Sequence, residues 1–193
     1  MSVLNLTRAL EELVADIVCL VSDFSHVDPA KVLICVSSTR GGGVHGTFAK
    51  IHPLRFPGGA RTREVKRARR VFTCTIPTVT HRDHEILYII YFLVPRFINL
   101  TLREKLITVF HELYHISPDF DGDIRRFPGR NFAHGSSRKR YNKHMESLVD
   151  RYLLEKKCLD NFGFLDVDMD TLRSKYQTIV ARKYPAPKIQ IQG

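Results

Sequence analysis

The sequence contains no closely spaced pair of cysteines. Its four cysteines, Cys19, Cys35, Cys74 and Cys158, are scattered along the chain, which excludes a zinc ribbon and a C-x-x-C redox motif. Each lies beside apolar residues, so we expect four buried free thiols. A long apolar run is also lacking. The most apolar one after the N-terminal segment, Ile86 to Leu93, is far shorter than the roughly 20 residues that span a bilayer.

The N-terminal segment lacks the features of an export signal. It has neither a basic n-region nor a small-residue cleavage site, and Glu11, Glu12 and Asp16 interrupt its apolar residues. We therefore expect a folded helix and a cytoplasmic protein with no membrane partner. Of the 193 residues, 44% are hydrophobic, including 12 Phe and 7 Tyr, which is enough to bury the core of one domain.

Acidic residues are few relative to basic ones. The chain has 20 Asp and Glu against 30 Lys and Arg, a formal net charge of +10 at pH 7, which favours DNA or another polyanion as a partner. Six cations within residues 61–70 are the candidates for binding it: Arg61, Arg63, Lys66, Arg67, Arg69 and Arg70. A solvated charged surface is the simpler explanation of such a run. A second cluster comprises Arg138, Lys139, Arg140 and Lys143.

Apolar periodicity and turn residues predict the order of the secondary structure. Leucine and isoleucine at three- and four-residue spacing predict an amphipathic helix over residues 5–23. β-Branched and aromatic runs predict strands at residues 32–36, 46–51, 71–76 and 85–94. The triple glycine after Arg40 predicts a turn, and the basic stretch up to Arg70 is expected to be irregular. Further helices are expected from Thr101, over 135–157 and over 170–181.

This order of helix, strands and helices is typical of an α+β domain. We expect a single domain over residues 1–183, in which a small mixed sheet precedes the helix that begins at Thr101 and more helices follow. Residues 184–193, rich in proline and polar residues, are expected to form an extended tail outside the core.

The helix that begins at Thr101 carries an H-E-x-x-H motif. Thr101 and Glu104 form a capping box, which predicts the start of the helix. His111 and His115 are four residues apart, so both imidazoles lie on one face and can bind one zinc ion at about 2 Å. Glu112 then lies beside the open coordination position, where it can take a proton from a water molecule and pass it to the leaving group. The alternative is a polar helix face with two solvated histidines.

A catalytic zinc ion needs a third protein ligand, for which four residues are candidates. His134, in an Ala-His-Gly sequence at the start of the next expected helix, is favoured. Glu146 lies inside that helix, with Asp150 four residues on as a carboxylate that could support it. Asp121 has the spacing of the H-E-x-x-H-x-x-G-x-x-H pattern, but the chain lacks the glycine of that pattern. His144 is more typical of a surface or core histidine.

The motif and its surroundings resemble two metallopeptidase families. HELYH followed by a loop and a His-Gly pair at a helix start is similar to the SprT/Spartan-like metallopeptidases. The longer stretch from Leu102 to Leu148, including FHELYHISPDFDGDIRRF, resembles the phage-type metallopeptidases, a group of zincins. These resemblances imply a zincin-like fold that hydrolyses peptide bonds, with zinc held by His111, His115 and His134 and with Glu112 as general base. Unlike SprT-like proteins, the sequence shows no C-terminal zinc ribbon.

The loop over residues 117–132 offers further candidates. Asp119, Asp121 and Asp123 could bind calcium, but they lack the register of an EF-hand loop, so a turn stabilised by Asx side chains is expected instead. Arg125, Arg126 and Arg130 either line the cleft and hold a substrate carboxylate or phosphate, or pair with these aspartates.

Two tyrosines near the motif are candidate donors to an oxyanion. Tyr141 is the one that we select. Tyr114 lies inside the helix beside the ligands, where a packing role is more common. The leading hypothesis is therefore a zinc peptidase acting on a protein or peptide. The alternatives are a nucleic-acid-associated binding protein with a structural metal ion, and a protease recruited to DNA.

Overall fold

The computed structural model describes residues 2–39, 46–128, 138–156, 159 and 162–193. The expected glycine turn at 40–43 and the candidate ligand His134 lie outside these residues, as do Arg130 and Cys158. The described residues form four helices and several small sheets in a single domain, so the predicted α+β class is confirmed. None of the helices in this part of the chain is long and apolar enough to cross a membrane.

The element order is β1-α1-β2-β3-β4-β5-β6-β7-β8-α2-α3-α4-β9-β10, with short 3-10 turns between some of them. The helices are α1 (Leu6–Leu20), α2 (Leu102–Tyr114), α3 (Arg138–Glu155) and α4 (Met169–Lys175). The strands are β1 (Val3–Asn5), β2 (Val32–Ser38), β3 (Ala49–Pro53), β4 (Thr62–Arg67), β5 (Arg70–Thr75), β6 (Val79–His81), β7 (His84–Ile86), β8 (Tyr88–Val94), β9 (Thr178–Val180) and β10 (Gln190–Gln192).

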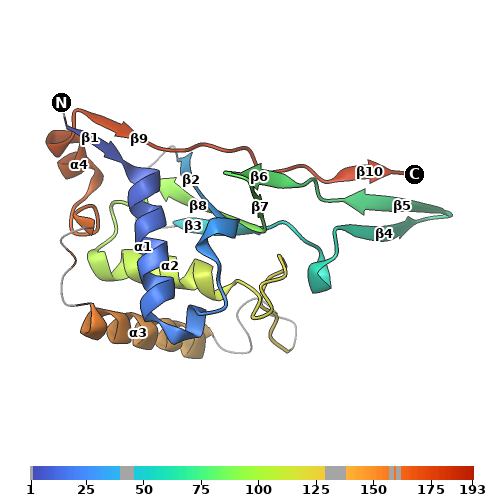
Figure 1. The fold of residues 1–193 in the computed structure, drawn as a ribbon, viewed down its shortest axis with the longest axis horizontal. Helices are drawn as coiled ribbons and strands as arrows, with labels where there is room; N and C mark the ends of the chain where they lie inside the picture. Colours follow the sequence, from blue (N-terminus) through green and yellow to red (C-terminus); the bar gives the residue numbers. More distant parts are fainter. Residues whose placement is uncertain (1, 40–45, 129–137, 157–158, 160–161) are drawn as a thin grey trace.

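A three-stranded mixed sheet with the order β2-β8-β3 lies at the centre of the domain (Figure 1). The central strand β8 pairs in parallel with β2 and antiparallel with β3. Residues Tyr88 to Phe92 are buried because both faces of the sheet are covered, which explains the unbroken apolar run that predicted this strand. β3 is an edge strand of this sheet.

The two faces of the sheet bury different side chains, because successive residues of a strand point to opposite sides. Ile34, Ile90 and Phe92 face the main core, which they share with α1, α2 and α3. Leu33 and Ile89 face a smaller core, which they share with the hairpin of β6 and β7. The helices therefore cover one face of the sheet and the hairpin covers part of the other.

The expected helices begin close to the predicted residues. Asn5 caps α1 by accepting a hydrogen bond from the Arg8 amide, and Thr101 caps α2 with the predicted capping box. α3 falls inside the expected 135–157. The expectation of one helix over 170–181 is wrong in its second half, since α4 ends at Lys175 and Thr178–Val180 forms β9. These β-branched residues pair in parallel with β1 instead.

The basic stretch before Arg70 is not irregular as expected. Residues Thr62–Arg67 form β4, which pairs antiparallel with β5 through a tight turn at Ala68, a residue with a positive φ of 52°. This hairpin extends away from the helices (Figure 1). Nearly every residue of β4 is exposed, so no alternation of apolar and polar residues marked it as a strand.

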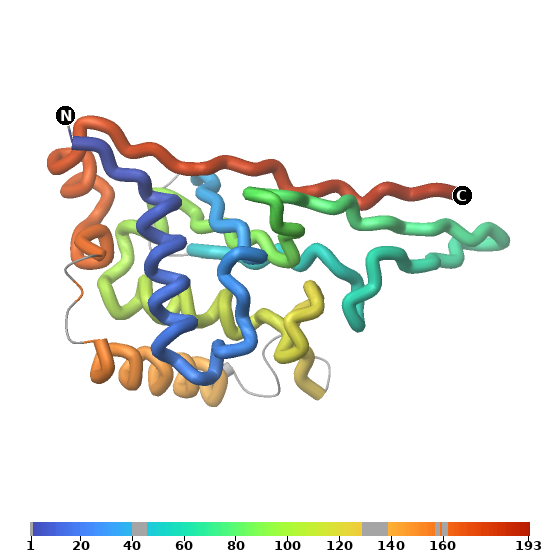
Figure 2. The backbone as a smooth tube through the Cα atoms, in the orientation of Figure 1, coloured from blue at the N-terminus to red at the C-terminus, as the bar shows by residue number. Residues whose placement is uncertain are grey.

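The last residues of the chain add a third strand to this hairpin. Figure 2 shows the chain after β9 running along one side of the molecule to its far end. The Val36 amide donates to the Arg182 carbonyl on the way, and β10 pairs antiparallel with β5.

Two further predictions are corrected by the structure. The expected strand over 85–94 is divided into β7 and β8 at Leu87. Cys35 is buried as expected, whereas Cys74 is half-buried and Cys19 is exposed.

Candidate active site

Helix α2 places the H-E-x-x-H motif against the core. Leu106, Val109 and Leu113 on the helix are fully buried. Their packing fixes the rotation of the helix about its axis, and with it the direction in which the motif residues point. The rings of His111 and His115 lie side by side, with centroids 4.7 Å apart and ring planes at 78°. His115 is only 8% exposed and forms the C-cap of the helix. The geometry brings both predicted histidines together on one side of α2.

Glu112 is a buried carboxylate, 7% exposed, between α2 and the edge strand β3. Burial raises the pKa of Glu112 from 4.5 to about 7, and a hydrogen bond with the Ile51 backbone on β3 lowers it in part. A pocket of about 260 Å³ opens beside Glu112 and His111 and is lined from the other side by residues 46–49. The carboxylate is therefore close to solvent-accessible space but held by the protein.

Tyr141 on α3 lies beside both histidines. Its ring centroid is 5.0 Å from that of His111 and 6.1 Å from that of His115. Burial raises the pKa of Tyr141 above its ordinary value of 10, and the charge of Glu112 raises it further, so the phenol stays protonated at neutral pH. Tyr114 packs against Tyr141 and His144 and lies 4.2 Å beneath the Arg125 guanidinium, which is a packing environment.

The described residues do not supply a third ligand. No group of three or more His, Cys, Asp and Glu side chains in the described ranges is placed to hold a metal ion. Thus Asp121, His144 and Glu146 do not complete a three-ligand site with His111 and His115. Glu146 is exposed, and its expected companion Asp150 is paired with Arg103 at 2.6 Å. The favoured candidate, His134, lies outside the described residues.

The loop after α2 uses its aspartates for its own structure. The Asp123 carboxylate accepts two hydrogen bonds of 2.9 Å from Arg126, and the Asp121 carboxylate accepts one of 3.0 Å from the Asp123 amide. The bond to Asp121 is the expected Asx turn. The Tyr88 hydroxyl also ties this loop to β8, because it donates to the Asp123 carbonyl and accepts from the Gly122 amide. Arg126 therefore pairs with an aspartate, which is one of the two predicted outcomes.

Two contacts of the site were not predicted from the sequence. The backbone of Ile51 reaches Glu112 only through the packing of β3 on α2. Arg125 is held at the end of α2, where its Nε donates to the Tyr114 carbonyl at 2.8 Å. The sequence predicted that Arg125 either holds a substrate anion or pairs with an aspartate, and this bond to a backbone carbonyl is neither of the two.

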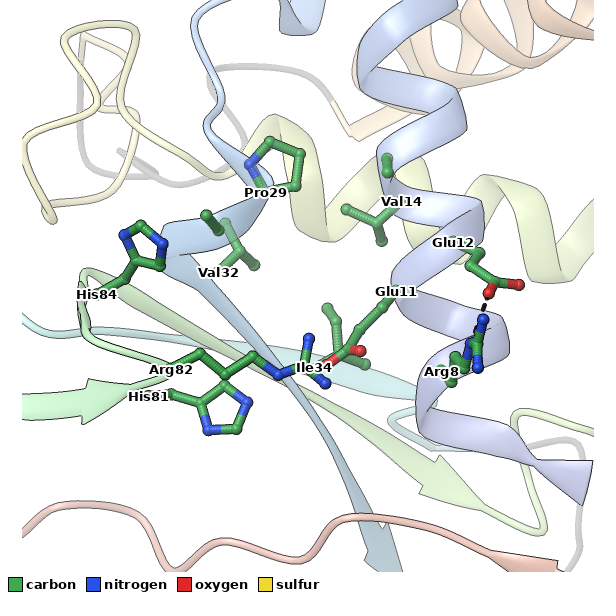
Figure 3. Close-up of a pocket in the computed structure, with 12 residues that line it drawn as sticks. Arg8, Glu11, Glu12, Val14, Pro29, Val32, Ile34, His81, Arg82 and His84 are labelled. Carbon is green, nitrogen blue, oxygen red and sulfur yellow. Dashed lines mark hydrogen bonds and ion pairs between the residues drawn. The ribbon is translucent and has the colours of Figure 1, made fainter.

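A second pocket lies between α1, β2 and the β6–β7 hairpin, as Figure 3 shows. It has a volume of about 590 Å³ and is lined by Arg8, Glu11 and Glu12 from α1 and by His81, Arg82 and His84 from the β6–β7 hairpin. Neither motif histidine lines it. The chemistry of the H-E-x-x-H motif therefore belongs to the smaller pocket beside α2.

The buried Glu112 has a consequence for the stability of the metal-free chain. Its pKa is higher in the folded chain, about 7, than in the unfolded chain, about 4.5, so the folded state holds the proton more tightly. The contribution of Glu112 to the free energy of unfolding is therefore largest below pH 4.5. It decreases by about 3 kcal/mol in total as the pH rises through 7. We expect the free energy of unfolding in the presence of a chelator to show this decrease, and a Glu112→Gln variant to lack it. Identical pH dependence of the two proteins would contradict the burial of an ionisable Glu112.

Comparison with known protein families gives a match that covers most of the chain. A family model described as "Putative phage metallopeptidase" matches residues 5–151, which include β2, β8, the whole of α2 and most of α3. Comparisons with curated proteins and with solved structures give no match. The matched range contains His111, Glu112, His115 and Tyr141.

Proposed function

Because the chain belongs to the putative phage metallopeptidase family, we propose that it is a zinc-dependent peptidase whose general base is Glu112. The observation that carries the proposal is a buried carboxylate flanked by two histidines one helical turn apart. Burying a carboxylate costs folding free energy, and such groups are concentrated at sites of catalysis.

We propose that His111, His115 and His134 hold the zinc ion. The two described rings suit this task, because they lie together on one side of α2 and imidazole nitrogen is a preferred zinc donor. Bound zinc would polarise the substrate carbonyl and acidify a water molecule. Glu112 is not assigned as a zinc ligand, since its carboxylate contacts the backbone of Ile51 on β3.

Glu112 is proposed to transfer the proton. A group transfers protons best when its pKa lies near the working pH, and burial brings the pKa of Glu112 to about 7. The carboxylate accepts a proton from the attacking water molecule and then donates it to the amine that leaves. Tyr141 is proposed to donate a hydrogen bond to the oxyanion, since it is protonated at neutral pH and lies beside both histidines.

The peptide substrate is proposed to bind along the outer edge of β3, which pairs with no other strand in the described part of the chain. Phe48 and Leu54 form backbone hydrogen bonds with the β7–β8 side of the sheet, so by alternation the backbone groups of Ala49 and Ile51 face away from it. Extended peptides bind such edges through main-chain hydrogen bonds. Since Ile51 contacts Glu112, a peptide on this edge passes directly by the carboxylate.

The test of this function is zinc-dependent hydrolysis of an unstructured protein such as casein. We expect activity to disappear with a chelator and to return with added zinc. Loss of a residue that hydrogen-bonds to a metal ligand lowers metal affinity by roughly 10–100-fold. His115→Ala removes a ligand itself, so we expect it to weaken zinc binding by more than this. Zinc affinity by competition with a chromogenic chelator, together with the rate of hydrolysis, measures both effects.

The matched control is His84→Ala. His84 is exposed in the β6–β7 hairpin, on the far side of the sheet from α2, so this variant should keep the zinc affinity and activity of the original chain. Equal zinc affinity of the His115→Ala and His84→Ala variants would exclude His115 as a ligand. Hydrolysis that persists in the chelator would exclude a metallopeptidase.

A further inference from the structure

The three strands β4, β5 and β10 form a basic arm that projects from the domain (Figure 1). β10 pairs only with residues Thr73–Thr75 of β5. Beyond them the arm is a two-stranded ribbon of β4 and β5 that ends in the turn at Ala68. The arm is therefore widest at its base and narrow at its tip.

The cations of this arm are concentrated on the ribbon and its turn. Of the six cations in residues 61–70, Arg61 pairs with Glu85 at 2.7 Å and ties the base of the arm to β7. The other five form no ion pair with a carboxylate in the described part of the chain: Arg63, Lys66, Arg67, Arg69 and Arg70. Their side chains are exposed. A set of unpaired, exposed cations this dense attracts a polyanion.

Most of these cations project from one face of the ribbon. Arg63, Arg67 and Arg70 share one face by the strand register, together with the half-buried Val65 and Phe72. On the other face Lys66 lies opposite the exposed Val71, and the exposed carboxylate of Glu64 shares this face. Apolar and basic side chains are thus mixed on each face. An element that inserts into a bilayer instead separates them into two faces, so the arrangement does not favour a lipid surface.

We propose that this arm binds double-stranded DNA. Strands of a sheet are about 4.8 Å apart, so a two-stranded ribbon fits the major groove of B-DNA, which is about 12 Å wide. A ribbon in the groove lies between the two phosphate backbones, so the long cationic side chains of its basic face and of its turn have phosphates within reach. Duplex RNA has a deep, narrow major groove that does not admit the ribbon. The contacts are with phosphates, so the binding does not depend on base sequence.

The salt dependence of binding tests this proposal. Each neutralised phosphate contributes about −0.9 to the slope of log K against log salt concentration, so five contacts give a slope of about −4.5. Affinity should then fall roughly 500-fold between 50 and 200 mM salt. We would measure it by fluorescence anisotropy with a labelled 20-base-pair DNA duplex, using duplex RNA and phosphatidylserine vesicles as competitors.

The decisive variant replaces Arg67, Arg69 and Arg70 with glutamine. We expect its slope to become less steep by about 2.7 and its affinity at 50 mM salt to fall. The control replaces Lys139, Lys143 and Lys175, which are exposed on α3 and α4, with glutamine and removes the same net charge. Thermal unfolding of each variant establishes that it is folded. The double variant Arg63→Gln/Lys66→Gln, which alters the strand rather than the turn, should also reduce the slope.

Three outcomes would overturn the proposal. The first is no binding of the original chain to the DNA duplex at 50 mM salt. The second is an equal loss of affinity in the arm variant and the control variant, which would indicate attraction by overall charge alone. The third is stronger competition by duplex RNA or by the vesicles than by unlabelled DNA. Each is independent of peptidase activity, so the two functions succeed or fail separately.

Discussion

We expect the Glu112→Gln variant to bind zinc as tightly as the original chain while its rate of hydrolysis falls by about 10²–10⁴-fold, the usual contribution of a general base. Glutamine has the shape of glutamate and can keep the contact with the backbone of Ile51, but it cannot accept a proton. Two measurements on the variant and on the original chain test this prediction: the rate of casein hydrolysis at saturating zinc, and the zinc affinity by chelator competition.

The same variant should remain folded, which separates lost chemistry from lost structure. The substitution removes the ionisable carboxyl of Glu112, a residue that is only 7% exposed, so the variant should be at least as stable as the original chain above pH 7. Loss of zinc from the variant would mean that Glu112 acts as a ligand. Unchanged activity would remove it from the mechanism.

The second large effect is expected at Lys105, a fully buried lysine on α2. Its ammonium group donates hydrogen bonds to the carbonyls of Phe164, Leu165 and Val167 at 3.2, 2.9 and 2.6 Å. Burial lowers the pKa of Lys105 to about 8, with the charges of Asp166 and Asp168 offsetting this in part. At neutral pH the amine is therefore still mostly protonated and has three N–H groups for three carbonyls.

A Lys105→Met variant keeps the length of the side chain but leaves these carbonyls without a donor. An unsatisfied buried polar group costs about 1–3 kcal/mol, so we expect the free energy of unfolding to fall by about 3 kcal/mol or more. Urea denaturation followed by circular dichroism measures it. The control, Lys139→Met, alters an exposed residue of α3 and should leave the midpoint nearly unchanged. A comparable midpoint for both variants would show that the contacts of Lys105 add nothing to stability.

Local signals in the sequence were sufficient for the helix that carries the site. Thr101 and Glu104 form the capping box that the sequence predicted, with the Thr101 amide donating to the Glu104 carboxylate at 2.9 Å. The apolar spacing of α1 and the β-branched run of β8 likewise predicted their elements, since each signal depends only on neighbours in the chain. The grouping of His111 with His115 follows from the helical repeat alone.

Other features depend on contacts between distant residues and had no local signal. β4 is exposed on nearly every residue and is a strand only because it pairs with β5. The segment after Lys175 was expected to remain helical, but it pairs with β1 at the other end of the chain. Lys105 was not identified as important, because a lysine in a helix is ordinarily exposed and the carbonyls that hold it lie about 60 residues further on.

The candidate site was predicted only in part, because some of its features also depend on contacts between distant residues. The position of Glu112 within the motif follows from the helix, whereas its burial depends on the edge strand β3, far earlier in the chain. Asp121 had a plausible spacing for a ligand, but its carboxylate forms the turn that Asp123 completes. Spacing alone could not show that the loop needs these aspartates for its own hydrogen bonds.

The central claim is that zinc binds at His111, His115 and His134, and anomalous scattering tests it most directly. Crystals of the chain would be soaked with zinc, and diffraction data collected on both sides of the zinc absorption edge. We expect one strong anomalous peak about 2 Å from a ring nitrogen of both His111 and His115, with His134 as the third protein ligand. A zinc-soaked crystal with no peak at these two histidines, or with its peak at another site, would contradict the claim.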